Sequence, residues 1–130
     1  MERQRILVDT SILIDHLRKA QKNQTYFYRA TLQYECVISA ITEFEFVVGC
    51  TPNNAVFVQH LLQIVPVLGF DSECVKTAAT IYQQLKRKNQ LISLPDLFIG
   101  ATALTHNISL LTLNQVHFKR ISGLTLCDLY

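Results

Sequence analysis

The sequence predicts an α/β domain in which a mostly parallel β-sheet carries helices on both faces. Short apolar runs alternate along the chain with segments of helical periodicity, and strands separated by helices need crossover connections, which are typical of parallel sheets. Apolar residues make up 49% of the 130 residues and charged residues only 17%, which suits elements covered on both faces. At this length a single domain, residues 1–130, is expected to bury one large core.

The apolar runs indicate where the strands lie. A buried strand is a short aliphatic run bounded by polar or turn residues. Helical segments separate most of these runs, as the crossovers of a parallel sheet require. Five segments fit the pattern, the last of them least well: Ile6–Val8, Val37–Ser39, Ile64–Val67, Leu110–Thr112 and Thr125–Cys127.

Two helices have the clearest patterns. From about Ser72 to Lys88, apolar residues recur at a spacing of three and four, and a basic run ends the segment, where cations suit the helix dipole. This run is expected to be a solvated helix end. Near Asp96–Thr105 nearly every side chain is apolar, which predicts a helix that is buried on all sides.

Composition narrows the class of protein. The net charge of +2 neither favours nor excludes nucleic acid. Asp9 and Asp15 interrupt the only apolar run near the N-terminus, so no signal peptide is expected, and no run approaches the roughly 18 apolar residues that span a membrane. Because no CxxC pair occurs, the cysteines are interpreted as reduced thiols of a cytoplasmic protein: Cys36, Cys50, Cys74 and Cys127.

Three acidic residues stand at expected junctions between elements. Asp9 follows the first strand, at the edge where parallel α/β sheets place their sites, and it is also in a position to cap the next helix. Glu45 has the spacing of a capping box with Thr42. Asp96 is a first-turn acid that suits the helix dipole. Taken singly, each residue fits a structural role as well as a role in a site.

Taken together, Asp9, Glu45 and Asp96 predict a metal site. Carboxylates about 4 Å apart repel by roughly 4 kcal/mol at an effective dielectric constant of ~20, so converging acids need protonation or a cation. All-oxygen ligands select hard ions such as Mg²⁺ or Mn²⁺. Such an ion activates water for attack on a phosphodiester, and Glu45 would bind it directly or through water.

Four segments resemble a known family when they are taken in order: VDTSILID, ISAITEFEFVVG, LPDLFIGATAL and LLTLNQVHFKRISGL. They resemble the PIN-domain nucleases, and most closely the VapC-type ribonuclease toxins of prokaryotic toxin–antitoxin pairs. The resemblance covers nearly the whole chain. It implies a three-layer α/β/α fold with a mostly parallel five-stranded sheet, and metal-dependent hydrolysis of RNA in an acidic pocket.

The resemblance also implies the site residues. The family's first acid matches Asp9, with Ser11 as its hydroxyl neighbour, and its third acid matches Asp96. Its second acid stands three residues after a Thr and four before a Gly, which selects Glu45. Its fourth position, an acid or Asn, matches Asn114, for which a helix cap is the structural alternative. The three acids are the expected metal ligands, while Ser11 and Asn114 would orient water, metal or phosphate.

Two points in the resemblance need a choice. Glu43 lies two positions before Glu45, but its distance from Thr42 and Gly49 does not match the family's second acid. Where many relatives carry an acid just before the Phe of the last motif, this chain has His117. Because of that departure, the site could bind either one metal ion or two. His117 is expected to be a surface or hydrogen-bonded histidine rather than a ligand.

The implied partners are an RNA substrate, a small antitoxin protein and a second copy of the chain, with no membrane. Apolar residues that would serve such contacts, or else the core, are Phe44, Phe46, Phe57 and Val58. Two other functions stay open. One is a magnesium-dependent phosphate hydrolase on another α/β fold, although Ser11 occupies the place of its usual second acid. The other is a non-catalytic module that binds RNA or protein.

Overall fold

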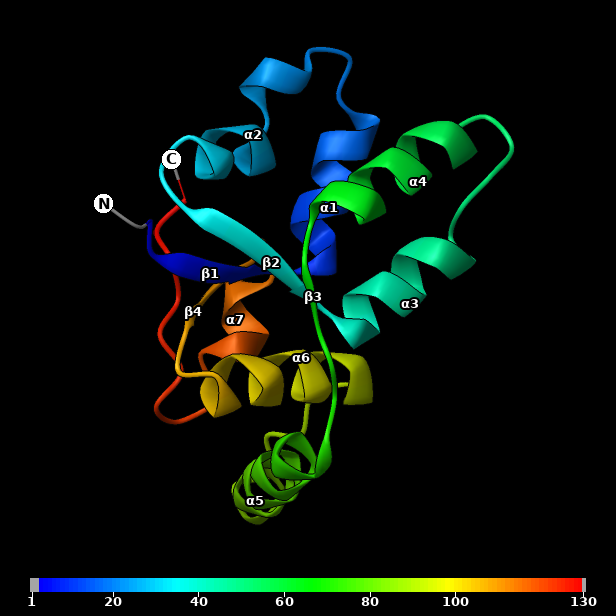
Figure 1. Ribbon diagram of the computed structural model, residues 1–130. Helices are drawn as coiled ribbons and strands as arrows, with labels where there is room; N and C mark the ends of the chain where they lie inside the picture. The colour runs from blue at the N-terminus through cyan, green and yellow to red at the C-terminus, as the bar shows by residue number, and fades with distance from the viewer. Residues whose placement is uncertain (1–2, 130) are drawn as a thin grey trace.

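The centre of the protein is a four-stranded sheet in which all strands are parallel, as seen in the computed structural model, which describes residues 3–129. The strands lie in the order β3-β2-β1-β4 (Figure 1). The predicted α/β class and parallel sheet are confirmed. The strands are β1 (Arg5–Val8), β2 (Glu35–Ser39), β3 (Val67–Leu68) and β4 (Ser109–Leu111).

The predicted fifth and third strands need correction. The expected fifth strand, Thr125–Cys127, is reduced to a single parallel bridge between Leu126 and Leu110. It pairs with β4 only through Leu110, whose N–H donates to Thr125 O at 2.9 Å and whose carbonyl accepts from Cys127 N–H at 2.8 Å. The sheet therefore has four strands rather than the expected five, because the terminal segment leaves β4 after one residue of pairing.

The third predicted strand, Ile64–Val67, begins too early. Ile64 is the last residue of α4 (Ala55–Ile64), and Val65 N–H still donates to Leu61 O at 3.1 Å. Only Val67 and Leu68 pair with β2, so the helix takes the first half of the apolar run.

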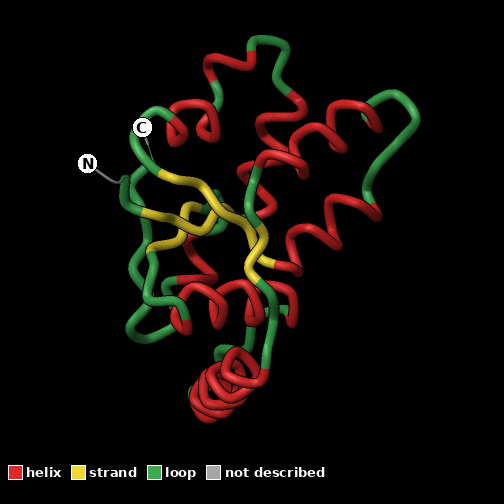
Figure 2. Tube along the Cα trace, viewed as in Figure 1, coloured by secondary structure: helices red, strands yellow, loops and turns green. Residues whose placement is uncertain are grey.

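Helices cover both faces of the sheet and make three layers (Figures 1 and 2). β1 explains why two cores form, since Ile6 and Val8 pack into one and Leu7 into the other. One core lies under α1 (Thr10–Arg18), α2 (Tyr26–Thr31) and α4; the other involves α5 (Ser72–Arg87), α6 (Leu94–Thr105) and α7 (Gln115–Phe118). α3 (Ala40–Val48) follows β2, and a short 3-10 helix covers Lys22–Gln24.

The predicted all-apolar helix is α6, and the layers explain its composition. α6 lies between the sheet and α5, with α5 outermost (Figure 1). Six of its residues are buried, from Leu97 to Ala103. The basic run that ends α5, by contrast, is exposed, as expected of a solvated helix end.

The apolar residues considered for partner contacts divide between core and surface. Phe46 and Val58 are 4% and 2% exposed and belong to the core beneath α4. Phe57 is partly buried, whereas Phe44 is 65% exposed. Of these residues, Phe44 alone projects substantially into solvent, so the surface interpretation is wrong for Phe46 and Val58.

Two sequence expectations concern the environment of the protein. The four cysteines are free thiols in the structure. Within residues 3–129, no helix has both the length and the apolar character that a membrane crossing requires.

Candidate active site

Asp9 lies at the carboxyl end of β1, where its backbone N–H donates to Leu111 O of β4 at 2.9 Å. Its side chain is nearly enclosed, at 4% exposed. Asp9 Oδ2 accepts hydrogen bonds from the hydroxyls of Ser11 at 2.8 Å and Thr112 at 2.7 Å. Although Asp9 occupies the N-cap position of α1, its side chain makes no capping hydrogen bond. The helix-cap interpretation of Asp9 is therefore wrong.

The loop after β4 is tied to Asp9 through two hydroxyls. Thr112, which is fully buried, accepts from Asn114 N–H at 2.9 Å while it donates to Asp9. Ser11 Oγ accepts from Leu113 N–H at 3.1 Å. Since each hydroxyl binds both the carboxylate and the loop backbone, the loop and Asp9 are held in one arrangement.

Burial is the main influence on the charge of Asp9. It raises the pKa of Asp9 above the ordinary 3.8, and the negative charge of nearby Asp96 raises it further. Hydrogen bonds from Thr112, Ser11 and the Thr10 backbone favour the ionised form and oppose this rise without cancelling it. A nearby cation would therefore stabilise the ionised carboxylate of Asp9.

Asp96 lies in the first turn of α6, where its backbone N–H donates to the Ser93 hydroxyl at 3.3 Å. Its Oδ2 accepts a hydrogen bond from Asn114 Nδ2 at 3.0 Å. Asn114 stands at the N-cap position of α7 but makes no side-chain capping bond. The cap interpretation of Asn114 is wrong, because its amide points to Asp96.

His117 lies beside this pair. Its Nδ1 is 2.8 Å from Asn114 Nδ2 and 3.5 Å from Asp96 Oδ2. An amide nitrogen can only donate, so one Asn114 hydrogen serves Asp96 and the other serves His117, whose Nδ1 then accepts. His117 is thus a hydrogen-bonded histidine with a half-exposed side chain, as the sequence predicted.

Glu45 is held by the hydroxyl of Thr10 rather than by a capping box. α3 begins at Ala40, and its cap is Ser39, whose hydroxyl accepts from Thr42 N–H at 3.0 Å. The capping-box interpretation with Thr42 is wrong, since Thr42 already lies inside the helix. Glu45 Oε1 instead accepts from the Thr10 hydroxyl at 2.7 Å.

The structure therefore gathers the predicted residues in two steps. Asp9, Ser11, Asp96 and Asn114 form one connected group at the ends of β1 and β4 and the start of α6. Glu45 is linked to that group through Thr10, the neighbour of Asp9. In the described part of the chain, no three residues among His, Cys, Asp and Glu form a ready-made metal cage.

Two contributors were not singled out from the sequence as site residues: Thr112 and Thr10. Thr112 ends the predicted strand Leu110–Thr112, and Thr10 stands between Asp9 and Ser11 in the first of the four family segments. Their hydrogen bonds join residues 103 and 35 positions apart, respectively, a separation that local sequence patterns do not reveal.

The donor set fits a hard divalent ion. Within residues 3–129, no Lys or Arg forms an ion pair with Asp9, Glu45 or Asp96. The negative charge of Asp96 acts on a buried Asp9, and both offer carboxylate oxygens, which Mg²⁺ and Mn²⁺ prefer. No Lys or Arg among residues 3–129 therefore balances the charge of these acids.

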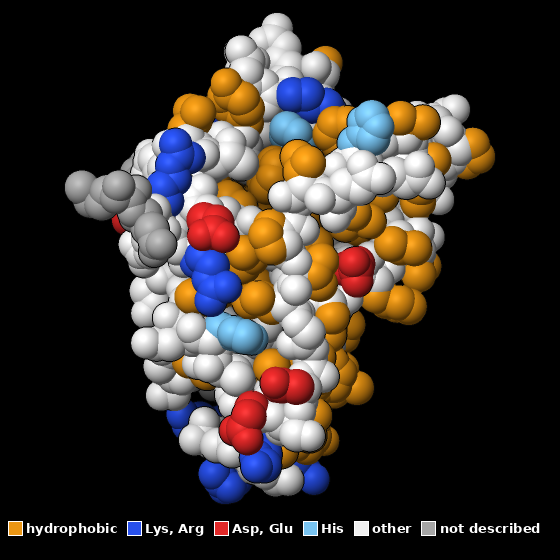
Figure 3. All heavy atoms as spheres, in the orientation of Figure 1, with side chains coloured by type: hydrophobic (Ala, Val, Ile, Leu, Met, Phe, Trp, Pro, Cys, Tyr) orange, Lys and Arg blue, Asp and Glu red, His pale blue; other side chains and the backbone are white. Residues whose placement is uncertain are grey.

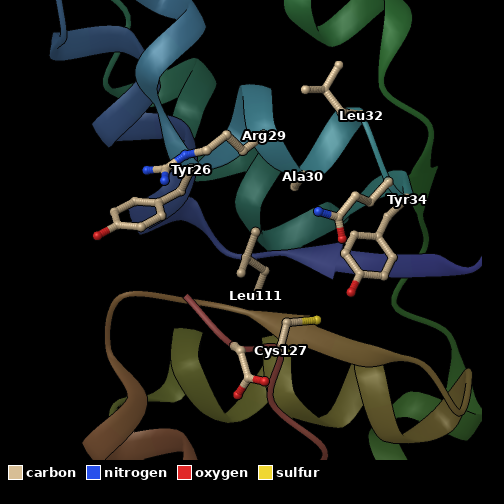
Figure 4. Close-up of a pocket in the computed structure, with 9 residues that line it drawn as sticks. Tyr26, Arg29, Ala30, Leu32, Tyr34, Leu111 and Cys127 are labelled. Carbon is tan, nitrogen blue, oxygen red and sulfur yellow. The ribbon is translucent and has the colours of Figure 1, made fainter. Parts of the chain in front are cut away.

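A pocket on the other side of β4 is separate from this site. It has a volume of about 130 Å³ and lies between α2 and the terminal segment (Figure 4). The Arg29 guanidinium lies 5.0 Å from the centre of the Tyr26 ring at its rim. None of the predicted site residues lines this pocket, whereas Glu45 lines a different one, of about 460 Å³, together with Arg18 and Phe46.

The α/β/α fold, and the acids gathered near the carboxyl ends of its parallel strands, agree with the family that the sequence resembles. Residues 6–124 match the sequence model of the PIN domain, and the chain belongs to the PIN-domain family.

Individual relatives narrow the class further. The chain is 35% identical to Ribonuclease VapC1 of Methanocaldococcus jannaschii, over 98% of this chain and 90% of the relative. It is 34% identical to Ribonuclease VapC1 of Rickettsia felis, over 92% of each.

Solved structures agree in fold. The structure of VapBC-1 from nontypeable Haemophilus influenzae matches with a TM-score of 0.82 and 26% identity, over 96% of this chain and 98% of that one. DNA-bound VapBC from Salmonella typhimurium matches in fold with a TM-score of 0.84 at 23% identity, over 98% of both chains.

Proposed function

We propose that this protein is a divalent-metal-dependent endoribonuclease that hydrolyses RNA phosphodiester bonds as the toxin of a toxin–antitoxin pair. The observation that carries the proposal is that Asp96, at the start of α6, acts by its charge on Asp9 at the end of β1. Asn114 binds Asp96, and no Lys or Arg among residues 3–129 forms an ion pair with either acid. Relatives named Ribonuclease VapC, at 35% and 34% identity, support the activity.

Asp9 and Asp96 would hold the ion, Mg²⁺ or Mn²⁺, and Glu45 would bind it directly or through water. When bound, the ion makes water a better nucleophile and stabilises charge on the phosphoryl oxygens. Ser11 and Thr112 fix the orientation of the Asp9 carboxylate by donating to its Oδ2. Asn114 fixes Asp96 in the same way and leaves its own carbonyl oxygen available to orient water or phosphate.

The proposal includes two protein partners, an antitoxin and a second copy of the chain. The structural neighbour from Haemophilus influenzae is a VapBC assembly. On this chain, Phe44, Val47 and Val48 project from α3 at 65%, 53% and 67% exposed, and Val56 projects from α4. Hydrophobic side chains gather on the side of the molecule that α3 and α4 form (Figure 3). A protein partner would cover such an apolar face. We place the protein in the cytoplasm, where its RNA substrate would be and where thiols stay reduced.

RNA cleavage by the metal-free protein, before and after addition of Mg²⁺ or Mn²⁺, tests the function. Wild type should cleave only with metal, and Asp9→Asn should cleave poorly with either ion. Cleavage that persists in chelator contradicts metal dependence. RNA binding without cleavage, under every metal condition, would favour the non-catalytic module instead.

A further inference from the structure

Thr10 contacts two of the three acids at once. It follows Asp9 in the chain, where its backbone N–H lowers the pKa of the Asp9 carboxyl, and its hydroxyl donates to Glu45 Oε1 at 2.7 Å. The Thr10 residue is 9% exposed. Because Asp9 and Thr10 are consecutive, this one residue fixes where Glu45 lies relative to Asp9.

Behind Thr10 runs a chain of hydroxyls. Thr42 Oγ1 lies 3.0 Å from Thr10 Oγ1 and 3.3 Å from Ser39 Oγ. Each hydroxyl has a single hydrogen to donate. Thr10 donates toward both Glu45 Oε1 and Thr42 Oγ1, and Ser39 donates to Thr42. Because Thr10 has one hydrogen, the two acceptors share it, and the Glu45 carboxylate, at the shorter distance, is the stronger acceptor.

Burial holds these groups in place. Ser39 and Thr42 are fully buried, so a polar atom left there without a partner would cost about 1–3 kcal/mol. Thr42 Oγ1 accepts from Ser39 and Thr10, while Ser39 Oγ accepts from Thr42 N–H at 3.0 Å. The Thr10 hydroxyl is therefore fixed between the buried start of α3 and the Glu45 carboxylate.

We propose that Thr10 is a positioning residue for the nuclease reaction, which holds the Glu45 carboxylate at a fixed place beside Asp9 but outside the Asp9–Asp96 pair. This inference rests on the proposed function. Because Thr10 holds Glu45 away from the Asp9–Asp96 pair, Glu45 forms no three-residue metal cage with these acids in the described part of the chain. Hydrogen bonds to a ligating or nearby carboxylate set its orientation, and their loss reduces metal affinity or activity by about 10- to 100-fold.

Two variants of Thr10 test the proposal. Thr10→Val keeps the shape and removes the hydroxyl, whereas Thr10→Ser keeps the hydroxyl. Calorimetric titration of the metal-free proteins with Mn²⁺, and kcat and KM for RNA cleavage, are the readouts. Thr10→Val should lose about 10- to 100-fold in Mn²⁺ affinity or in kcat with little change in KM, and Thr10→Ser should restore most of the loss. Equal values for wild type and a folded Thr10→Val would overturn the proposal.

A double-mutant cycle with Glu45→Gln shows whether Thr10 acts through Glu45. If it does, Thr10→Val should cause no further loss in the Glu45→Gln background; additive losses would contradict the proposal. Should Thr10→Val fail to fold, Thr42→Val removes the buried hydroxyl against which Thr10 is placed and must give a smaller loss in the same direction. Absence of metal-dependent cleavage in wild type would instead refute the proposed function, while the Mn²⁺ titrations would still decide the role of Thr10.

Discussion

The side-chain amide of Asn114 donates to Asp96 Oδ2 at 3.0 Å, across 18 positions of sequence and from a different helix. The fourth position of the site, for which the resemblance implies an acid or Asn, thus supplies a hydrogen-bond donor. The second amide hydrogen serves His117. The site carries less negative charge at this end than an all-acid site, which favours one tightly bound ion.

His117→Ala tests that metal count. The imidazole accepts from Asn114 and has no hydrogen-bond contact with Asp9 among the described residues, so its removal should leave most of the cleavage activity, within about threefold. Calorimetry should find one tight divalent ion per chain in both proteins. Two tight ions in wild type, with one lost in His117→Ala, would refute the single-ion account.

Asp9→Asn should change how the stability of the metal-free protein depends on pH. Burial, and then Asp96, raise the folded pKa of Asp9, whereas the unfolded chain ionises near about 3.9. Between these two values the folded protein holds the extra proton, so its free energy of unfolding falls as pH rises through the folded pKa. Below both values Asp9 is protonated in both states and this loss is absent.

Urea unfolding of the metal-free wild type and Asp9→Asn from about pH 4 to about pH 8 measures this effect. The difference in free energy of unfolding should shift in favour of Asp9→Asn as pH rises, because Asn keeps the acceptor for Ser11 and Thr112 without the charge. A difference that is independent of pH would show that Asp9 titrates normally.

Glu45→Gln and Glu43→Gln are a matched pair two positions apart on α3. Glu45 accepts the Thr10 hydroxyl, while Glu43 has no side-chain hydrogen bond or ion pair among those resolved in residues 3–129. Glu45→Gln should therefore reduce metal-dependent cleavage by at least about tenfold, and Glu43→Gln should leave it within about twofold. The reverse ranking would show that the second acid was assigned to the wrong residue.

Periodicity and composition predicted the central strands and helices of the fold better than the edge strands and their boundaries. The apolar runs of β1 and β2 and the amphipathic pattern of α5 are local signals, and their positions were correct within two residues. The strand at Thr125–Cys127 depends on pairing with Leu110, and the extent of that pairing is a tertiary property. For the same reason, a run such as Ile64–Val67 does not show where a helix ends and a strand begins.

At the site, the sequence identified the acids but misjudged what holds them. Asp9 and Asn114 occupy cap positions, so capping was a sound expectation, yet neither side chain caps its helix. The spacing of Glu45 from Thr42 matches that of a capping box, but the N-cap residue of α3 is Ser39. Two of the acids are instead held by the hydroxyls of Thr10, Ser11 and Thr112. The sequence alone does not show which hydroxyl binds which acid, because the fold brings them together.

The central claim is that the carboxylates of Asp9 and Asp96 repel each other, and that a bound divalent ion relieves this repulsion. Asp96→Asn removes one charge and keeps an acceptor for Asn114. Relief of the partly screened repulsion is worth about 1 kcal/mol, or roughly 3–5 °C in melting temperature for a domain of this size. Loss of a favourable helix-dipole contact acts in the opposite direction by about 0.3–1 kcal/mol.

Thermal melts of wild type and Asp96→Asn, each without metal and with Mn²⁺, measure both sides of this claim at once. Without metal, Asp96→Asn should melt at or above the melting temperature of wild type. Mn²⁺ should raise the melting temperature of wild type by several degrees more than that of the variant. The reason is that a ligand which binds only the folded state stabilises it more when it binds more tightly. A variant that melts lower without metal and responds to Mn²⁺ as strongly as wild type would contradict the account and leave Asp96 as a helix-dipole residue.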